Sequence, residues 1–232
     1  MKSSVKVILA LTVLVAGVPP AWAQKTSAIP LDKLDKQQPF NVKTEVETYK
    51  GLKSLRVVDA ASSDAADGIQ LVVLNDTNFR DGTMEVELTG APMENAKNTA
   101  ARGFVGLAFR FDDTAKDAPR YECFYVRPTN GRTEDQVRRN HATQYISYPD
   151  FPWFQLRKDF PGKYESYADM VPGEWMKLKI VVHGDEARLY VQDAPQPALV
   201  VTDLKHGQSQ GKIALWVGTG TIAHFANLRV TQ

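Results

Sequence analysis

Residues 127–144 gather arginine, asparagine and histidine side chains that could bind the polar groups of a small ligand. Guanidinium and amide groups donate paired hydrogen bonds to hydroxyls, carboxylates and sulfates. His141 is the one histidine of four with such neighbours, and an imidazole can transfer protons near neutral pH. The alternative is that the arginines pair locally with Glu134 and Asp135. The candidate binding residues here are Arg127, Asn130, Arg132, Asn140 and Gln144.

Aromatic residues are the second chemical signal, because residues 121–170 hold half of the chain's Phe, Tyr and Trp. An aromatic ring offers an apolar face to the C–H side of a pyranose while polar neighbours bind the hydroxyls. The alternative is that prolines make residues 145–167 a long loop that packs its rings inward at one end of the fold. The candidate sugar platforms are Tyr145, Tyr148, Trp153, Phe154 and Tyr164.

Two pairs of charged residues could supply acid–base chemistry. Glu85 and Glu87 share one face of a predicted strand, so their carboxyls should lie about 6 to 7 Å apart, near the spacing of paired glycosidase carboxylates. A solvated outer sheet face is the alternative. Arg110 and Glu122 stand on predicted neighbouring strands. They could bind a sugar, with Glu122 as a catalytic base, or form a cross-strand salt bridge.

The first 23 residues have the composition of a signal peptide. Lys2 and Lys6 precede an apolar run at residues 7–18, and a small-x-small cleavage site ends at Ala23. The apolar run is too short for a transmembrane helix, so no membrane insertion is expected. These features predict a periplasmic or secreted protein that begins at Gln24.

The overall charge and the cysteine content narrow the classes of partner and cofactor. The formal net charge is +1, which favours neither nucleic acid nor an anionic membrane as a partner. A single cysteine, Cys123, cannot form an internal disulfide and is expected in the core. No metal-binding motif is evident, although a divalent cation such as Ca²⁺ could be held by oxygen ligands from separate loops. The oligomeric state is not predicted.

Short β-branched or alternating runs, separated by Gly, Pro and polar residues, predict an all-β sandwich or barrel. Residues 24–43 are expected to form an extended leader, and residues 44–232 a single β-sandwich domain. Residues 133–140 could form a short helix with a Thr133/Gln136 capping box. The predicted strands lie at 52–60, 68–75, 83–90, 102–111, 121–128, 198–204, 211–218 and 223–230, with a hairpin at 176–193.

Strand periodicity assigns the faces of the two central runs. Residues 105, 107, 109 and 111 form one large apolar face. In the next strand, Tyr121, Cys123 and Tyr125 are expected to face the core because a lone thiol belongs there, which puts Glu122 on the other face with Phe124.

The strand order over residues 68–232 resembles the concanavalin A-like lectin and glucanase superfamily, which includes laminin-G-like domains and 3-keto-disaccharide hydrolases. The matching segments are GFVGLAFRF, YECFYVRP, Gly173-Glu174-Trp175, GKIALWVG and HFANLRV. Phe124 replaces an expected polar residue, residues 145–167 are longer than a minimal version needs, and Gly90 stands where laminarinase-type glucanases have a third acid.

The resemblance implies an antiparallel jelly-roll β-sandwich and an exported carbohydrate-active protein that hydrolyses a 3-keto-glycoside at a groove on the concave sheet. Glu122 and His141 would then transfer protons, and Arg110 and Arg127 would orient the glycoside ligand. One alternative is a non-catalytic glycan-binding or cell-surface interaction module of the same fold. Another is a structural domain whose residues 145–167 dock on a protein.

Overall fold

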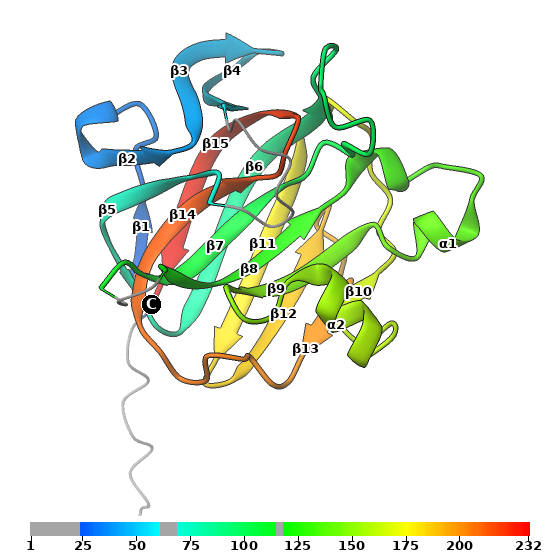
Figure 1. Ribbon diagram of the computed structural model, residues 1–232. Helices are drawn as coiled ribbons and strands as arrows, with labels where there is room; N and C mark the ends of the chain where they lie inside the picture. Colours follow the sequence, from blue (N-terminus) through cyan, green and yellow to red (C-terminus); the bar gives the residue numbers. More distant parts are fainter. Residues whose placement is uncertain (1–23, 61–68, 115–117) are drawn as a thin grey trace, which may run out of the picture.

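The computed structural model describes residues 24–60, 69–114 and 118–232. Two antiparallel sheets pack face to face, with a few short helices at one side (Figure 1). This architecture confirms the predicted all-β sandwich. The predicted signal peptide, residues 1–23, lies outside the described residues, and no helix in the described part is long and apolar enough to cross a membrane.

The larger sheet has eight strands in the order β13-β12-β11-β6-β15-β4-β3, with β1 also paired to β15. Its strands are β1 (Thr26–Ala28), β3 (Val42–Tyr49), β4 (Leu52–Asp59), β6 (Gly82–Pro92), β11 (Met176–His183), β12 (Glu186–Val191), β13 (Leu199–Val201) and β15 (Thr221–Thr231). The expected hairpin is confirmed, because β11 and β12 pair through His183 and Glu186.

The second sheet has seven strands in the order β10-β9-β8-β7-β14-β5-β2. Its strands are β2 (Gln37–Phe40), β5 (Leu71–Phe79), β7 (Val105–Asp112), β8 (Arg120–Val126), β9 (Thr143–Tyr148), β10 (Glu165–Ser166) and β14 (Gly211–Val217). The helices are η1 (Leu34–Lys36), η2 (Pro128–Asn130), α1 (Gln136–Arg139) and α2 (Trp153–Asp159).

The seven-stranded sheet is apolar on both faces. Its inner face contributes Phe124 and Val126 to the main core between the sheets. Its outer face carries a second apolar cluster that includes Tyr121, Cys123 and Tyr125. The expected orientation of β8 is therefore wrong, since the lone thiol is buried in the outer cluster and the Glu122 side of the strand faces the main core.

A β-bulge at Arg110 changes the phase of β7. Arg110 has a φ of 54°, and the pairing with β8 shifts register between Phe109 and Asp112. The extra residue turns Phe111 to the outer cluster, whereas Leu107 and Phe109 stay in the main core. The single apolar face expected over residues 105–111 is thus broken at its last member.

Two segments that were expected to be irregular form regular structure. Residues 145–167 contain most of β9, the whole of α2 and β10, and this strand–helix–strand arrangement replaces the expected long loop. The extended leader at residues 24–43 supplies β1, η1 and β2. Helix α1 is capped by Asp135, whose carboxylate accepts from the backbone of Val137 and Arg138, and not by the expected Thr133/Gln136 box.

Candidate functional site

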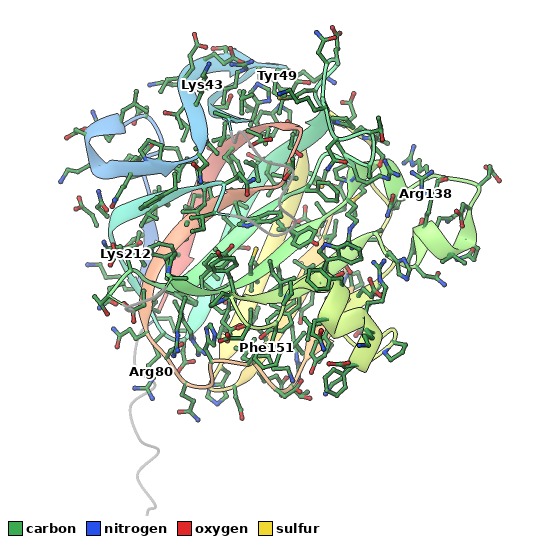
Figure 2. The ribbon with its side chains drawn as sticks, viewed as in Figure 1. Lys43, Tyr49, Arg80, Arg138, Phe151 and Lys212 are labelled. Carbon is green, nitrogen blue, oxygen red and sulfur yellow. The ribbon has the colours of Figure 1, made fainter. Side chains whose placement is uncertain are left out.

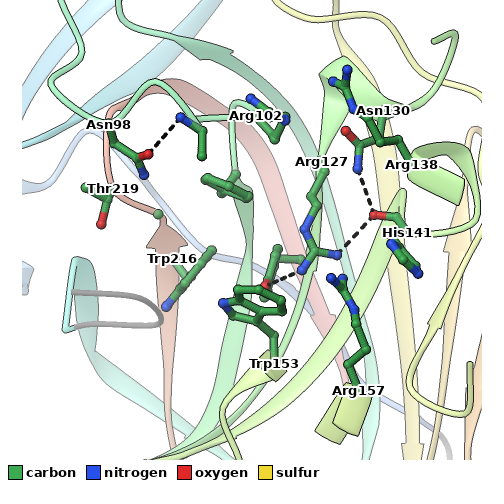
Figure 3. Close-up of a pocket in the computed structure, with 14 residues that line it drawn as sticks. Asn98, Arg102, Arg127, Asn130, Arg138, His141, Trp153, Arg157, Trp216 and Thr219 are labelled. Atoms are coloured by element: carbon green, nitrogen blue, oxygen red, sulfur yellow. Dashed lines mark hydrogen bonds between the residues drawn. The ribbon is translucent and has the colours of Figure 1, made fainter. Parts of the chain in front are cut away.

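A pocket of about 290 Å³ lies on the outer face of the seven-stranded sheet, beside α1 and α2 (Figure 3). The ends of β8 and β14 form its floor, and residues that precede β7 close one side. Arg127, Arg138, Arg157 and His141 stand on the side nearest the helices. The pocket thus combines aromatic rings with planar hydrogen-bond donors.

The floor is a pair of stacked rings whose contact depends on a glycine. Tyr125 on β8 and Trp216 on β14 both pair with Gly106 of the intervening strand. Their ring centroids are 4.5 Å apart at an interplanar angle of 24°. A Cβ at Gly106 would lie 2.7 Å from that of Tyr125, so a larger residue would displace the ring. Phe104 meets Tyr125 edge-on at 6.2 Å.

Trp153 adds a ring at the side of this floor. It is the first residue of α2, directly after Pro152, which has an extended backbone and ends the preceding turn. The guanidinium of Arg157, one helical turn later, lies 4.6 Å from the centroid of the Trp153 ring. This stacking fixes the indole at the edge of the pocket, where it remains partly exposed.

Arg127 is the central cation of the pocket and is only 5% exposed. Its guanidinium donates to the carbonyl of His141 at 3.0 Å, to the Tyr125 hydroxyl at 2.9 Å and to Gln144 Oε1 at 3.0 Å. Three of the pocket's rings surround it: those of Tyr125, Trp153 and Phe104, with centroids at 5.0, 5.9 and 6.0 Å. The position of Arg127 is therefore fixed from several sides.

Three further arginines line the pocket. Arg157 forms a bidentate ion pair with Glu165, with N–O distances of 2.9 and 2.7 Å. Arg102 donates to the carbonyl of Ala101 at 2.9 Å, and Arg138 comes from α1. Burial, together with the positive charges of Arg138 and Arg127, lowers the pKa of Arg102.

His141 is the titratable group of the pocket best suited to exchange protons near pH 7. Its Nε2 lies 3.4 Å from Glu165 Oε1, and 24% of its side chain is exposed. Burial lowers the pKa of His141 below its ordinary value of 6.5, against the opposing effect of Glu165. A neutral imidazole beside a carboxylate can accept a proton from a bound ligand.

Four of the residues predicted from the sequence come together in this pocket: Arg127, Asn130, His141 and Trp153. Asn130 Nδ2 donates to the carbonyl of His141 at 3.2 Å, beside Arg127 on the same oxygen. Gln144 lies behind Arg127 and is buried; its amide donates to the carbonyls of Tyr145 and Tyr164. It therefore positions Arg127 and does not reach the cavity.

Arg110 and Glu122 lie elsewhere. Glu122 is fully buried on the main-core side, where it accepts from the Tyr145 hydroxyl at 2.6 Å and from the His206 backbone at 2.8 Å. Arg110 donates to the carbonyls of Arg80, Gly184 and Gly207. Figure 2 shows Arg80 far from Arg138, on the opposite side of the molecule. Arg110 and Glu122 hold loops at that end, so the expected groove containing both is not observed.

The remaining candidates also lie outside the pocket. Arg132 forms an exposed ion pair with Asp169, and Asn140 accepts from Gln136 at the end of α1. Tyr145 is buried in the main core. Tyr148 stacks on Tyr121 at 5.0 Å on the outer face of the sheet, and it does not line the cavity.

Glu85 and Glu87 lie on the outer face of the eight-stranded sheet, on the opposite side of the sandwich. They pair across the strands with Lys179 and Lys177 respectively, and Arg229 stands beside Glu85 on β15. This alternation of charges is the solvated sheet face that was the alternative to a catalytic carboxylate pair.

Most residues of the pocket were not predicted from the sequence. The predicted face assignment of β8 turned the Tyr125 side chain towards the main core. Trp216 was predicted only as a member of a strand, with no role in binding. Arg157 would have required recognition of α2, because only a helix places it one turn after Trp153. The pocket residues absent from the predicted set are Asn98, Ala100, Arg102, Phe104, Tyr125, Arg157, Trp216, Gly218 and Thr219, whereas Arg138 belongs to the arginine-rich residues 127–144 that the sequence singled out.

Metal-binding side chains are not clustered in the part of the chain that the structure describes. No group of three or more His, Cys, Asp or Glu residues there is arranged to hold an ion. A Ca²⁺ site built from carbonyl oxygens and single carboxylates stays a prediction.

Solved structures of other proteins have the same fold. Carbohydrate-binding module CBM66 from Bacillus subtilis has a TM-score of 0.56 at 16% identity, covering 84% of this chain and 95% of its own. A putative glycosyl hydrolase from Parabacteroides distasonis scores 0.55 at 11% identity, covering 89% and 98%. The Bacillus licheniformis beta-glucanase scores 0.51 at 13% identity, covering 90% and 98%. The chain therefore has the concanavalin A-like jelly-roll fold, as the sequence resemblance implied.

The family follows from the sequence itself. Residues 32–231 match the model of the 3-keto-alpha-glucoside-1,2-lyase-like domain, also described as the 3-keto-disaccharide hydrolase family. The chain belongs to this family. No curated protein sequence matches it.

Proposed function

We propose that this protein is an exported carbohydrate-active protein that binds a saccharide in the pocket on the seven-stranded sheet. The observation that carries the proposal is the partly exposed Trp153 ring, which lies beside Arg127 over the buried Tyr125–Trp216 stack. An aromatic ring bordered by planar donors fits a pyranose, which has an apolar C–H face and hydroxyls at its edge.

Family membership supports cleavage of a 3-keto-glycoside as the reaction, and this pocket is its proposed site. In such a sugar the ketone at C3 acidifies the hydrogen at C2. A base removes that proton, the C1–O bond breaks, and the leaving oxygen takes a proton; water added across the new C1–C2 double bond completes hydrolysis. His141 is the proposed base, because its lowered pKa keeps it neutral at pH 7.

Arg127 and Asn130 are the proposed donors to the developing charge on the C3 oxygen. Both side chains line the pocket and are held by the same carbonyl, that of His141. Donors fixed before the reaction stabilise an enolate without reorganisation. The base and the two donors would then act on adjacent carbons of one sugar ring.

A non-catalytic glycan-binding module is the second candidate. The observation that favours it is the absence of Asp or Glu among the described residues that line the pocket. The nearby Glu165 is already bound by Arg157 and His141. A site with rings and donors but without a free carboxylate can bind a sugar without cleaving a standard glycosidic bond.

One experiment separates the two candidates. The chain from Gln24 onward is incubated with glycosides and 3-keto-glycosides, with and without EDTA or added Ca²⁺, while calorimetry measures binding. Product from 3-keto-glycosides that His141→Gln lacks supports the lyase-type reaction, and loss of product with EDTA would show a cation requirement. Binding without product supports the module. Neither binding nor product would refute both.

Export is proposed from the predicted signal peptide and has a separate test. The full chain is expressed in a bacterium, and the cells are fractionated. The expected result is a mature protein that begins at Gln24 in the periplasm or medium. A cytoplasmic protein that retains residues 1–23 would contradict export and leave the binding proposal intact.

A further inference from the structure

We infer that the saccharide is acidic and that its carboxylate or sulfate group binds Arg127 and the neighbouring arginines. This inference rests on the proposed binding function and narrows its ligand class. It starts from the charge balance of the pocket, which differs from that of the rest of the surface.

Arg127 is a buried cation with neutral partners. Its three hydrogen-bond acceptors are a carbonyl, a phenol hydroxyl and a side-chain amide. Removing a guanidinium from water costs free energy that neutral groups offset only in part. The guanidinium has five N–H donors, so the three hydrogen bonds leave donors for an oxyanion. A ligand that carries a negative charge would complete the site.

Arg102 and Arg138 strengthen the local excess of positive charge. Among the described residues, no carboxylate lies at ion-pair distance from Arg102, Arg127 or Arg138. Elsewhere on the surface, arginines such as Arg132 and Arg188 have acidic partners at 2.7 and 2.6 Å. In a chain with a formal charge of only +1, three described arginines that lack an acidic partner thus share one cavity.

The like charges in the pocket repel one another. The charges of Arg138 and Arg127 disfavour the protonated form of Arg102, in the same direction as its burial. An oxyanion bound between the three would convert this repulsion into attraction. Guanidinium groups bind carboxylate and sulfate oxygens in paired hydrogen bonds.

The rings and the charges are placed to bind one ligand together. Tyr125 belongs to the aromatic floor and also accepts from Arg127 through its hydroxyl. The partly exposed Trp153 ring has its centroid 5.9 Å from the same guanidinium, so a sugar stacked on Trp153 would have its edge at Arg127. A sugar hydroxyl at that edge could accept hydrogen bonds from the Arg127 guanidinium, but it would not neutralise the positive charge. A carboxylate or sulfate would do both.

The test compares matched ligands by calorimetry on the chain from Gln24 onward. Glucuronate- and galacturonate-containing disaccharides form the first arm, their methyl esters the neutral control, and sulfated disaccharides the second arm. We expect the acidic form to bind at least roughly tenfold more tightly than the ester, with a difference that shrinks as salt is raised. The arm with the tighter binding identifies carboxylate or sulfate as the group.

Variants tie the effect to the pocket. Arg102→Gln and Arg138→Gln are each expected to weaken binding of the acidic form roughly tenfold and to weaken binding of the ester much less. Arg229→Gln removes one exposed charge from the opposite sheet and serves as the control. Arg102 and Arg138 are both partly exposed, so these two variants should fold. A substitution of the buried Arg127 could prevent folding and is therefore not used.

The outcomes separate this inference from the proposed function. If esters and neutral sugars bind as tightly as the acids, the ligand is not acidic, and the saccharide proposal stands. If the acids bind more tightly but the two variants match Arg229→Gln, the charge is recognised elsewhere and the inference is refuted. If no saccharide binds, both proposals fail.

Discussion

The Tyr145 hydroxyl donates a 2.6 Å hydrogen bond to Glu122 inside the sandwich. Burial, followed by the negative charge of Glu122, raises the pKa of Tyr145 well above its ordinary value. The backbone of Lys205 donates to the same hydroxyl at 2.8 Å, and that of His206 donates to Glu122 at 2.8 Å. The pair thus anchors the segment that contains Lys205 and His206, and this role is structural.

Replacement of Glu122 tests that role. Glu122→Gln keeps the size of the side chain, but it removes the charge and places an amide N–H where an acceptor is needed. We expect the free energy of unfolding to fall by about 1–3 kcal/mol, while saccharide affinity stays within about twofold of wild type. Denaturant unfolding and calorimetry provide the two measurements. A stable variant that has lost catalysis or binding would instead place Glu122 in the functional site.

Trp153 should carry a large share of ligand affinity. Trp153→Ala removes a partly exposed ring from the pocket edge, so saccharide binding is expected to weaken roughly tenfold or more. Phe154→Ala is the matched control, because Phe154 is the next residue of α2, is 51% exposed and does not line the pocket. Equal effects of the two substitutions in calorimetry would argue that α2 acts only through the fold.

The alternation of residues predicted the strands well because each strand leaves its own period-2 signature. The alternation did not assign the two faces of β8 correctly, because both faces of this sheet are buried and neither carries a regular row of polar residues. Cys123 illustrates the ambiguity: a thiol is equally buried in the main core and in the outer cluster. The family resemblance predicted the β-sandwich, but it did not predict on which face of the sheet Glu122 lies.

Most of the pocket was not predictable, for a related reason. Arg127, Asn130 and His141 lie close together in the sequence, so the local concentration of polar side chains could be recognised there. Arg102 and Trp216 are far apart in the sequence and meet at the cavity only because of the order of the strands in the sheet. This order depends on contacts between distant parts of the chain, so local sequence patterns do not reveal it. The bulge at Arg110 was equally hidden, because a positive φ at a non-glycine residue has no pattern in the sequence.

His224 should make stability pH-dependent. It is buried on the eight-stranded sheet, stacks on Tyr49 at 3.9 Å and has Nε2 at 2.7 Å from Glu47. Burial lowers the pKa of His224 below 6.5 despite Glu47. The unfolded chain therefore binds a proton more readily, and stability present above about pH 6.5 is lost as the pH falls towards the folded-state pKa.

Denaturant midpoints at about pH 7.5 and about pH 5.5 measure this loss. His224→Gln cannot be protonated, so its midpoint should fall less on acidification than that of wild type, although the variant is less stable overall. His141 has a lowered pKa as well and contributes to the slope that remains. Identical slopes in wild type and variant would show that His224 does not titrate in this way.

If the protein cleaves 3-keto-glycosides, its rate should depend on neutral His141. Because burial lowers the pKa of His141 below 6.5, the rate should stay on its plateau below pH 6.5 and fall only as the imidazole becomes protonated. A pH–rate profile of kcat/KM on a 3-keto-glycoside gives the apparent pKa. An inflection above 6.5, or an unchanged profile in His141→Gln, would assign the base to another group.

The central claim is that the ligand binds on the seven-stranded sheet, and tryptophan indole resonances test it most directly. The chain from Gln24 onward has three tryptophans: Trp153 and Trp216 line the pocket, whereas Trp175 lies beside His224 on the other sheet. In an ¹⁵N NMR titration with an acidic disaccharide, we predict that the Trp153 and Trp216 indole signals shift together and that the Trp175 signal does not. Saturable binding that moves Trp175 alone, or none of the three, would contradict the account.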